Sequence, residues 1–193
     1  MSGVDAPQDG RLERDPDSSL ARAARAGDRA ALTALLTRHR QVVFGIASRI
    51  LSDRADALDA TQEACVRIWR FLGSYDPERP FAAWVRTVAV RAALDQARRT
   101  RPFREEAGVD VPDPAGGPLE AAHRAEAGRA VTAALASLSP RQRAAFVCRE
   151  IEGMEMDEVA AALGCLAVTA RWHLFEARKR LAAALAPFEG GLP

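Results

Sequence analysis

The chain has 193 residues, with 27 basic and 26 acidic side chains and a formal net charge of +1 at pH 7. This balance excludes the strong overall positive field of many nucleic-acid-binding proteins, so any such function must depend on local charge. Because 48% of the residues are apolar but no apolar run approaches the roughly 18 residues of a membrane span, we expect a cytoplasmic globular protein without membrane insertion.

The first half of the chain predicts three long helices. Residues 1–17 are rich in Asp, Pro, Gly and Ser and are expected to form a disordered tail. Over residues 20–50, apolar side chains recur at spacings of three, four and seven, which predicts one amphipathic helix. A second helix follows at 53–72, with an aspartate as its N-cap. Residues 73–80 are dense in turn formers and predict an exposed loop, after which a third helix covers 81–100.

A segment rich in proline and glycine divides the chain at residues 102–118. It has almost no apolar periodicity, so we expect a flexible linker. The linker separates a first domain, residues 18–101, from a second, residues 119–186, and a short tail follows at 187–193. The expected fold class is therefore all-α, with two small helical domains.

Helix boundaries in the second domain are marked by their capping residues. Residues 139–142 read Ser-Pro-Arg-Gln, a capping box with proline in the first helical position. Another helix is expected from near Met156 to Leu163, where Gly164 can adopt the left-handed conformation that ends a helix. The last helix is expected over residues 167–185.

The stretch from Val159 to Leu174 has the spacing of a helix-turn-helix, with a small Ala160 at the helix crossing and Gly164 in the turn. Its second helix would present an outward face of basic, polar and aromatic side chains: Thr169, Arg171, Trp172, Phe175, Arg178 and Lys179. Such a face can enter a major groove of DNA, reading bases and contacting phosphates. The alternative is an ordinary helical hairpin with a solvated basic face.

Local positive charge also gathers on the predicted helix at 81–100. Residues 81–104 hold one acid, Asp95, and six arginines: Arg86, Arg91, Arg98, Arg99, Arg101 and Arg104. Four aromatic residues lie nearby in the sequence: Trp69, Tyr75, Phe81 and Trp84. An arginine-rich helix alone is more often simply solvated. Aromatic rings interleaved with basic groups, however, can hold unpaired bases at about 1–3 kcal/mol per stacked base.

An acidic and polar stripe on the second helix consists of Asp56, Asp59, Gln62 and Glu63, at spacings of three and four. A stripe of this charge repels DNA. It is either a solvated face or a docking surface for a basic protein partner.

Catalysis is not predicted. Cys65 and Cys148 lie in apolar helical patterns, Cys165 has no ligand spacing to either, and neither a disulfide framework nor a zinc site is indicated. Three histidines, at positions 39, 123 and 173, are far apart and have no evident partners for acid-base chemistry. We therefore expect no enzyme activity, no metal and no cofactor.

These motifs occur in an order that resembles the extracytoplasmic-function sigma factors of the sigma-70 family. Residues 56–70 and 81–99 resemble the two halves of region 2 of that family. Residues 138–165 resemble region 4, and residues 177–181 resemble its basic end. The short linker leaves no room for the region 3 domain of larger sigma factors.

The resemblance implies an RNA polymerase specificity subunit that directs promoter recognition, minus-10 melting and transcription initiation, for a stress or envelope regulon. It implies that Asp56, Asp59, Gln62 and Glu63 contact the clamp helices of core polymerase. It places Tyr75, Asp76, Trp84, Arg86, Arg91, Asp95, Arg98 and Arg99 at the minus-10 element. It places Arg141, Thr169, Arg171, Trp172, Phe175, Arg178 and Lys179 at the minus-35 element. The further partner implied is an anti-sigma factor, and the free chain is expected to be a monomer.

Some positions depart from the family pattern. Leu58 stands where an acid is common, and Arg91 stands where Asn is frequent. Leu166 and Val168 replace the usual Ser and Gly before the recognition helix, which removes an N-cap worth about 1 kcal/mol. The main alternative function is a transcription regulator that binds operators through the same helix-turn-helix without acting as a polymerase subunit.

Overall fold

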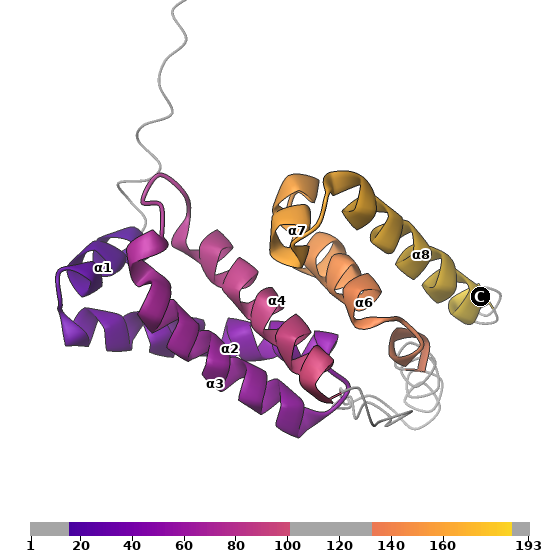
Figure 1. Cartoon of the computed structure of the whole chain (residues 1–193), viewed down its shortest axis with the longest axis horizontal. Helices are drawn as coiled ribbons and strands as arrows, with labels where there is room; N and C mark the ends of the chain where they lie inside the picture. The colour runs from indigo at the N-terminus through magenta and orange to yellow at the C-terminus, as the bar shows by residue number, and fades with distance from the viewer. Residues whose placement is uncertain (1–15, 101–132, 187–193) are drawn as a thin grey trace, which may run out of the picture.

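The computed structural model describes residues 16–100, here called the N-terminal block, and residues 133–186, the C-terminal block (Figure 1). Every regular element in these two ranges is a helix, so the predicted all-α fold class is confirmed for them. None of the helices in this part of the chain combines the length and apolarity needed to cross a membrane. Of the predicted tail, residues 1–17, the first 15 lie outside the described residues, as do the linker at 102–118 and residues 187–193, while residues 16 and 17 are helical, contrary to the prediction.

The single helix predicted for residues 20–50 is wrong, because the structure has two helices there. α1 spans Pro16–Arg25 and α2 spans Arg29–Ile50. Gly27 adopts a φ of 100°, which only glycine adopts at little cost. Asp28 then caps α2 by accepting hydrogen bonds from the backbone amides of Ala30 and Ala31. The apolar spacing continues across this turn, so the sequence pattern did not reveal the break between the two helices.

The two helices predicted next are confirmed. α3 spans Arg54–Phe71 and α4 spans Phe81–Thr100, with a single 3-10 turn, η1, at Leu72–Ser74 after α3. Asp53 caps α3 as expected, accepting hydrogen bonds from the backbone amides of Ala55 and Asp56. Helices α2, α3 and α4 pack side by side around a core of buried apolar side chains, among them Leu35, Ile46, Ile68, Val85 and Val90.

The C-terminal block contains α6, Pro140–Phe146, a π-helical turn η2, Val147–Ile151, α7, Met156–Leu163, and α8, Ala167–Leu185. The predicted capping box at the start of α6 is present, and Gly164 ends α7 with a φ of 63°. Helices α7 and α8 form the predicted helix-turn-helix. The π-helical turn had no counterpart in the sequence-based prediction.

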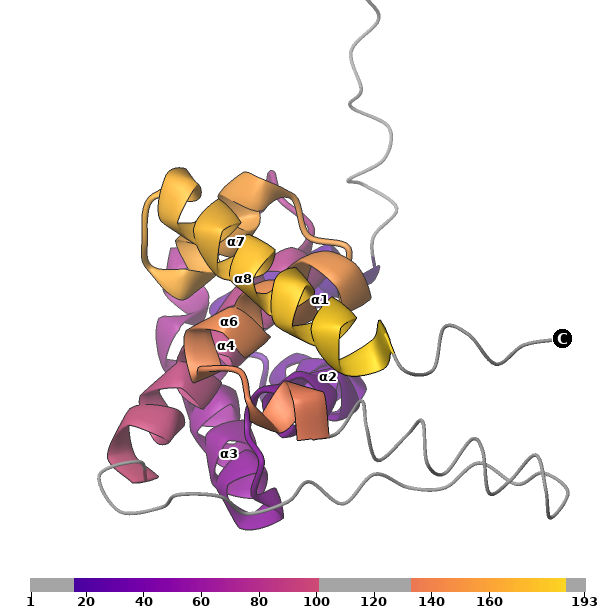
Figure 2. The same ribbon diagram turned by 90° about the vertical axis from the view of Figure 1, so that its right-hand side faces the viewer.

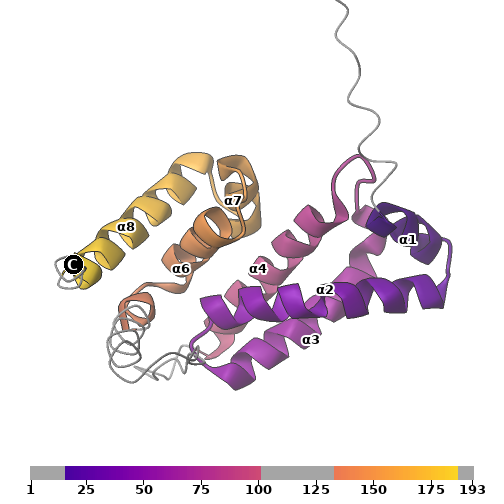
Figure 3. The same cartoon turned by 180° about the vertical axis from the view of Figure 1, so that it is seen from behind.

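The two blocks are in contact, which the sequence did not predict. Helices α6 and α7 pack on α4, and α6 also reaches α2 (Figures 2 and 3). One continuous cluster of buried apolar side chains joins the blocks and includes Val85, Ala89, Ala92, Ala145, Cys148, Val159 and Leu163. A separate small cluster of Ala134, Leu138, Ala177 and Leu181 closes the C-terminal block on its other side.

Candidate nucleic-acid and partner interfaces

The acidic stripe on α3 divides into two exposed and two half-buried side chains. Asp59 and Gln62 are exposed. Asp56 accepts a hydrogen bond from Gln96 Nε2 at 3.1 Å, which ties it to α4. Glu63 is also held toward α4, because it pairs with Arg67, which in turn pairs with Asp95 of α4. The part of the stripe that is free to meet a partner is therefore narrower than the sequence suggested.

Arg67 joins α3 to the acid of α4. Its Nε donates to Glu63 Oε1 at 2.7 Å, and its Nη1 donates to Asp95 Oδ2, also at 2.7 Å. Asp95 pairs in addition with Arg98 one turn later on α4. Asp95 thus pairs with one arginine of α3 and one of α4. Arg98 and Arg99 stay exposed at the end of α4.

Six of the eight residues in the loop before α4, residues 73–80, are exposed, as predicted, but Tyr75 is buried. Tyr75 is 2% exposed, and its ring packs against Phe81 at 5.1 Å and Trp84 at 5.8 Å between centroids. Its hydroxyl donates to the carbonyl of Arg79 at 2.6 Å. The burial of this ring removes Tyr75 as a surface on which a base could stack in this arrangement. Asp76 is exposed, as predicted, and Trp84 is half-buried, as expected of a partly core residue.

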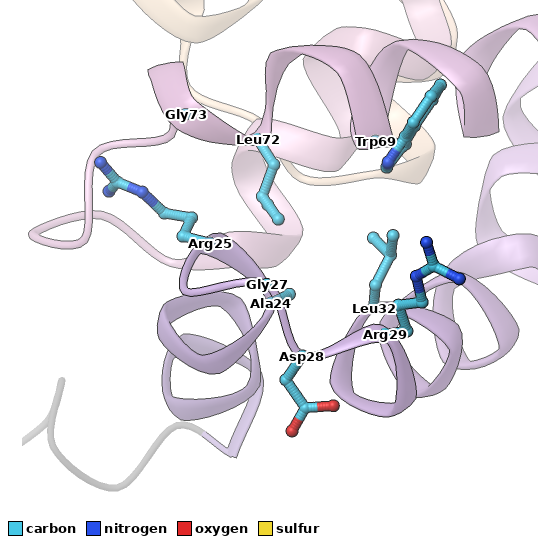
Figure 4. A pocket seen from close by; sticks show the side chains of 9 residues that line it. All are labelled: Ala24, Arg25, Gly27, Asp28, Arg29, Leu32, Trp69, Leu72 and Gly73. Atoms are coloured by element: carbon cyan, nitrogen blue, oxygen red, sulfur yellow. The ribbon is translucent and has the colours of Figure 1, made fainter.

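A pocket of about 510 Å³ opens beside this loop, at the corner between α1 and α2 (Figure 4). The indole of Trp69 forms one side and is 62% exposed. The guanidinium of Arg25 donates to the carbonyl of Tyr75 at 3.3 Å. The residues around the pocket are Ala24, Arg25, Gly27, Asp28, Arg29, Leu32, Trp69, Leu72 and Gly73. Indole, aliphatic and guanidinium groups together are suited to unpaired bases.

Arg86 and Arg91 on α4 contact the C-terminal block. Arg86 Nε lies 3.4 Å from Glu152 Oε2, and Arg91 Nη2 donates to the carbonyl of Ala161 at 2.8 Å. Glu152 also lies near α2, with its Oε1 3.5 Å from Arg49 Nη1. The sequence placed both α4 arginines on a free basic face, but each has a protein partner here.

The outer face of α8 is exposed and unusually apolar for a basic helix. Trp172 and Phe175 are 54% and 61% exposed, which confirms the prediction that they point outward. Val168 precedes Trp172 by four residues and continues the same face at 66% exposure. The predicted basic side chains Arg171 and Lys179 are also exposed.

The remaining predicted residues of this domain are either paired or partly buried. Arg178 is exposed but pairs with Glu150 of the π-helical turn. Thr169 and Arg141 are half-buried. Burial lowers the pKa of His173, and the positive charge of Arg141 lowers it further. The imidazole of His173 therefore favours its neutral form.

Two side chains that the sequence did not single out connect the blocks. One is Glu152, described above. The other is Arg143, which is 2% exposed and donates through Nη1 to the Ile50 carbonyl at 3.0 Å and to Ser52 Oγ at 2.7 Å. Its Nη2 donates to the carbonyl of Leu138 at 3.3 Å. The only sequence signal for its burial is its place one helical turn before the apolar Val147.

Cys148 lies fully buried beside this contact. Burial raises the pKa of its thiol to about 12, and the nearby carboxylate of Glu152 acts in the same direction. The thiol is therefore protonated and unreactive in the folded chain. This supports the interpretation of Cys148 as a small core side chain.

Comparison with known proteins agrees with this arrangement. The family description "Sigma-70 region 2" matches residues 35–103, and "Sigma-70, region 4" matches residues 128–181. The ECF RNA polymerase sigma factor SigM of Mycobacterium tuberculosis is 32% identical over 183 residues, which cover 95% of this chain and 91% of that protein. The chain belongs to the extracytoplasmic-function sigma factors. It is an RNA polymerase sigma factor, a subunit without enzymatic activity of its own.

Two further relatives show the extent of the similarity. The ECF sigma factor SigE of Mycolicibacterium smegmatis is 34% identical over 164 residues, and the match spans 80% of this chain but 63% of that longer protein. The solved structure of CnrH in complex with the cytosolic domain of CnrY is 29% identical to this sigma factor. It superposes with a TM-score of 0.62, covering 89% of this chain and 97% of CnrH.

Proposed function

We propose that this sigma factor divides its binding between surfaces of opposite charge. The exposed acidic and polar side chains of α3, Asp59 and Gln62 above all, bind the clamp helices of core polymerase, with Asp56 and Glu63 in supporting positions. The observation that carries this proposal is their exposure on a helix separate from both basic helices. A negatively charged surface is suited to a basic protein partner and repels DNA.

The basic and aromatic surfaces then bind two promoter segments. The minus-10 element is bound by α4 while its strands separate. The contacts come from Arg98 and Arg99 at the end of the helix and from Trp84 and the other predicted residues of α4, together with Asp76 in the loop before it. Tyr75 supports this surface from the protein interior, because its buried ring and hydroxyl hold the loop that carries Asp76.

Region 4 reads the minus-35 element through α8. Arg171 is exposed near the start of this helix, where side chains reach base edges in a major groove. The exposed rings of Trp172 and Phe175 suit the methyl groups of thymines. Arg178 and Lys179, farther along, are placed to contact phosphates.

We also propose an anti-sigma factor as a regulatory partner, with the sigma factor acting in the cytoplasm. The relative CnrH was solved in complex with the cytosolic domain of CnrY, a protein partner. In the present chain, the exposed apolar side chains at the start of α8, Leu166, Val168, Trp172 and Phe175, are of the kind that a protein partner covers.

The test of this division uses charge reversal on α3. Asp59→Arg with Gln62→Arg leaves the Glu63–Arg67 ion pair in place, so the fold of α3 and α4 should persist. We expect copurification with core polymerase to be lost, while binding to duplex promoter DNA is kept.

A control pair, Ser19→Arg with Glu78→Arg, makes the same change in charge at exposed positions off α3. We expect it to copurify like the wild type. Unchanged association of the α3 variant would reject the proposed polymerase surface. An operator-binding regulator, the alternative, predicts that neither pair affects its activity on DNA.

A further inference from the structure

The exposed face of α8 has few side chains that could read bases by hydrogen bonding. From Leu166 to Arg180 the exposed residues are Leu166, Val168, Arg171, Trp172, Phe175, Arg178, Lys179 and Arg180. None of them carries an amide, which reads adenine, or a carboxylate, which accepts from cytosine. The hydroxyl of Thr169 and the carboxylate of Glu176 belong to half-buried side chains. Near the helix start, hydrogen-bonded reading is therefore left to Arg171, whose guanidinium suits guanine.

Three apolar side chains form a continuous stripe on this face, here called the apolar stripe: Val168, Trp172 and Phe175. They follow one another at spacings of four and three, which places them on one side of α8. Leu166 lies just before the helix and is 74% exposed. The helix itself lies on the side of the C-terminal block away from the N-terminal block (Figure 1). The apolar stripe is therefore open to a ligand as large as a DNA duplex.

We propose that region 4 reads the ring methyl groups of pyrimidines in the minus-35 element and so accepts 5-methylcytosine where it accepts thymine. The inference rests on the proposed function, because it takes α8 to be the helix that enters the major groove. In that groove thymine presents a methyl group, which apolar side chains contact. Methylation of cytosine adds the same methyl at the same ring position. Cytosine methylation of a minus-35 element therefore strengthens its binding to this sigma factor.

The charges around the apolar stripe favour DNA as its occupant. Arg171 lies beside Trp172 in the sequence, and Lys179 and Arg180 follow Phe175 in the next turn, all of them exposed. No acidic side chain is exposed between Leu166 and Arg180. Cations that flank an apolar surface can pair with phosphates while that surface meets the base edges between them. A second copy of this chain would instead bring like charges together.

The first test changes only the DNA. A promoter at which core polymerase initiates with this chain is resynthesised with uracil in place of each thymine of its minus-35 element, on both strands. Uracil keeps the base pairing and the groove oxygen of thymine and lacks only its methyl. From the usual effect of burying one such group, we expect the affinity of the holoenzyme to fall about fourfold for each methyl that the apolar stripe contacts.

The second test restores the methyl on a different base. At a position where uracil weakens binding, the pair is changed to cytosine with guanine, and the cytosine is then replaced by 5-methylcytosine. We expect the methylated duplex to bind about fourfold more tightly than its unmethylated counterpart. Equal binding of these two duplexes would overturn the inference.

The variant Val168→Ala with Phe175→Ala assigns the effect to the apolar stripe. Both side chains are exposed on a helix, where alanine has the highest propensity, so α8 should keep its fold. We expect the variant to lose most of the difference between thymine and uracil duplexes. The matched control is Ile151→Ala, which removes an exposed apolar side chain of the same block outside α8 and should discriminate like the wild type. A full difference in the double variant would mean that the methyl acts through DNA shape, and the inference would be wrong.

The outcomes separate this inference from the proposed function. If the holoenzyme initiates at its promoters but uracil in the minus-35 element leaves binding unchanged, methyl reading is wrong and the proposed function stands. If the chain directs no initiation by core polymerase, both are wrong. If the double variant loses binding to a protein partner but binds both duplexes like the wild type, the apolar stripe is a protein-docking surface and the inference fails.

Discussion

The two blocks of this sigma factor are stabilised in different ways. The N-terminal block is built from the 10-residue α1 and three long helices of 22, 18 and 20 residues, two of them with aspartate N-caps, around an aliphatic core. The C-terminal block has helices of 7 and 8 residues before α8, and its largest fully buried side chain is Arg143. The C-terminal block therefore adds to its apolar core a buried arginine whose hydrogen bonds reach the neighbouring block.

The largest effect is expected from Arg143→Ala, which attacks the feature that distinguishes the blocks. The change leaves the carbonyls of Ile50 and Leu138 without their buried donor. We expect the free energy of unfolding of the C-terminal block to fall by at least about 3 kcal/mol. Urea denaturation followed through Trp172 reports on this block.

The control for that experiment is Arg180→Ala in the same block. Arg180 is exposed and makes one hydrogen bond, to the Ser137 carbonyl at 3.1 Å. We expect a loss of no more than about 0.5 kcal/mol, as for other surface changes. Equal losses for the two variants would mean that the buried arginine does not distinguish the C-terminal block.

The next effect concerns the exposed face of α8, whose Arg171 has no partner block over it, whereas Arg86 and Arg91 of α4 contact the other block. Arg171→Ala is expected to weaken binding to duplex promoter DNA by about 1–3 kcal/mol, with a loss that depends on the minus-35 sequence. Fluorescence anisotropy with intact and scrambled minus-35 duplexes measures it. A loss of equal size on both duplexes would make Arg171 a phosphate contact.

A smaller effect of opposite sign is expected from Leu166→Ser. Leu166 occupies the N-cap position of α8, is 74% exposed and makes no side-chain capping bond. Serine would cap α8 as aspartates cap α2 and α3, raising the free energy of unfolding by about 1 kcal/mol. Leu166→Ala, which removes the same exposed leucine without adding a cap, is the control. Equal stability of the serine and alanine variants would contradict the capping account.

The smallest effect is a pH dependence of the C-terminal block. The pKa of His173 is lowered by burial and then by Arg141, so the unfolded chain takes up a proton more readily than the folded chain. The stability from this residue is present above pH 6.5, its ordinary pKa, and is lost as the pH falls below that value. Urea denaturation on both sides of this pH should show a smaller difference for His173→Gln than for the wild type. An unchanged pH dependence in the variant would exclude His173 as its source.

Local signals predicted the helices and most of their ends. Asp53, the Ser139 capping box and Gly164 each mark a boundary through contacts with residues a few positions away, and each boundary is where the sequence placed it. The break at Gly27 was missed because one apolar stripe runs across both helices. An extended apolar period does not report a turn whose two sides bury the same face.

The sequence predicted which helix faces are polar. It did not predict which side chains on those faces are exposed and which contact another part of the chain. The sequence correctly placed Trp172 and Phe175 outside, because they fall on the polar side of α8. It could not show that Arg91 meets a carbonyl 70 residues away or that Arg143 meets one 93 residues away. Nor could it show that aromatic packing draws Tyr75 inward from a segment rich in turn formers. Such contacts depend on tertiary packing, which no local period records.

The most direct test of the account is initiation by purified core RNA polymerase on genomic fragments from the source organism, with and without this chain. We predict RNA 5′ ends at a new set of positions only when the chain is present, and their loss with Asp59→Arg and Gln62→Arg. Identical start positions with and without the chain would contradict the account.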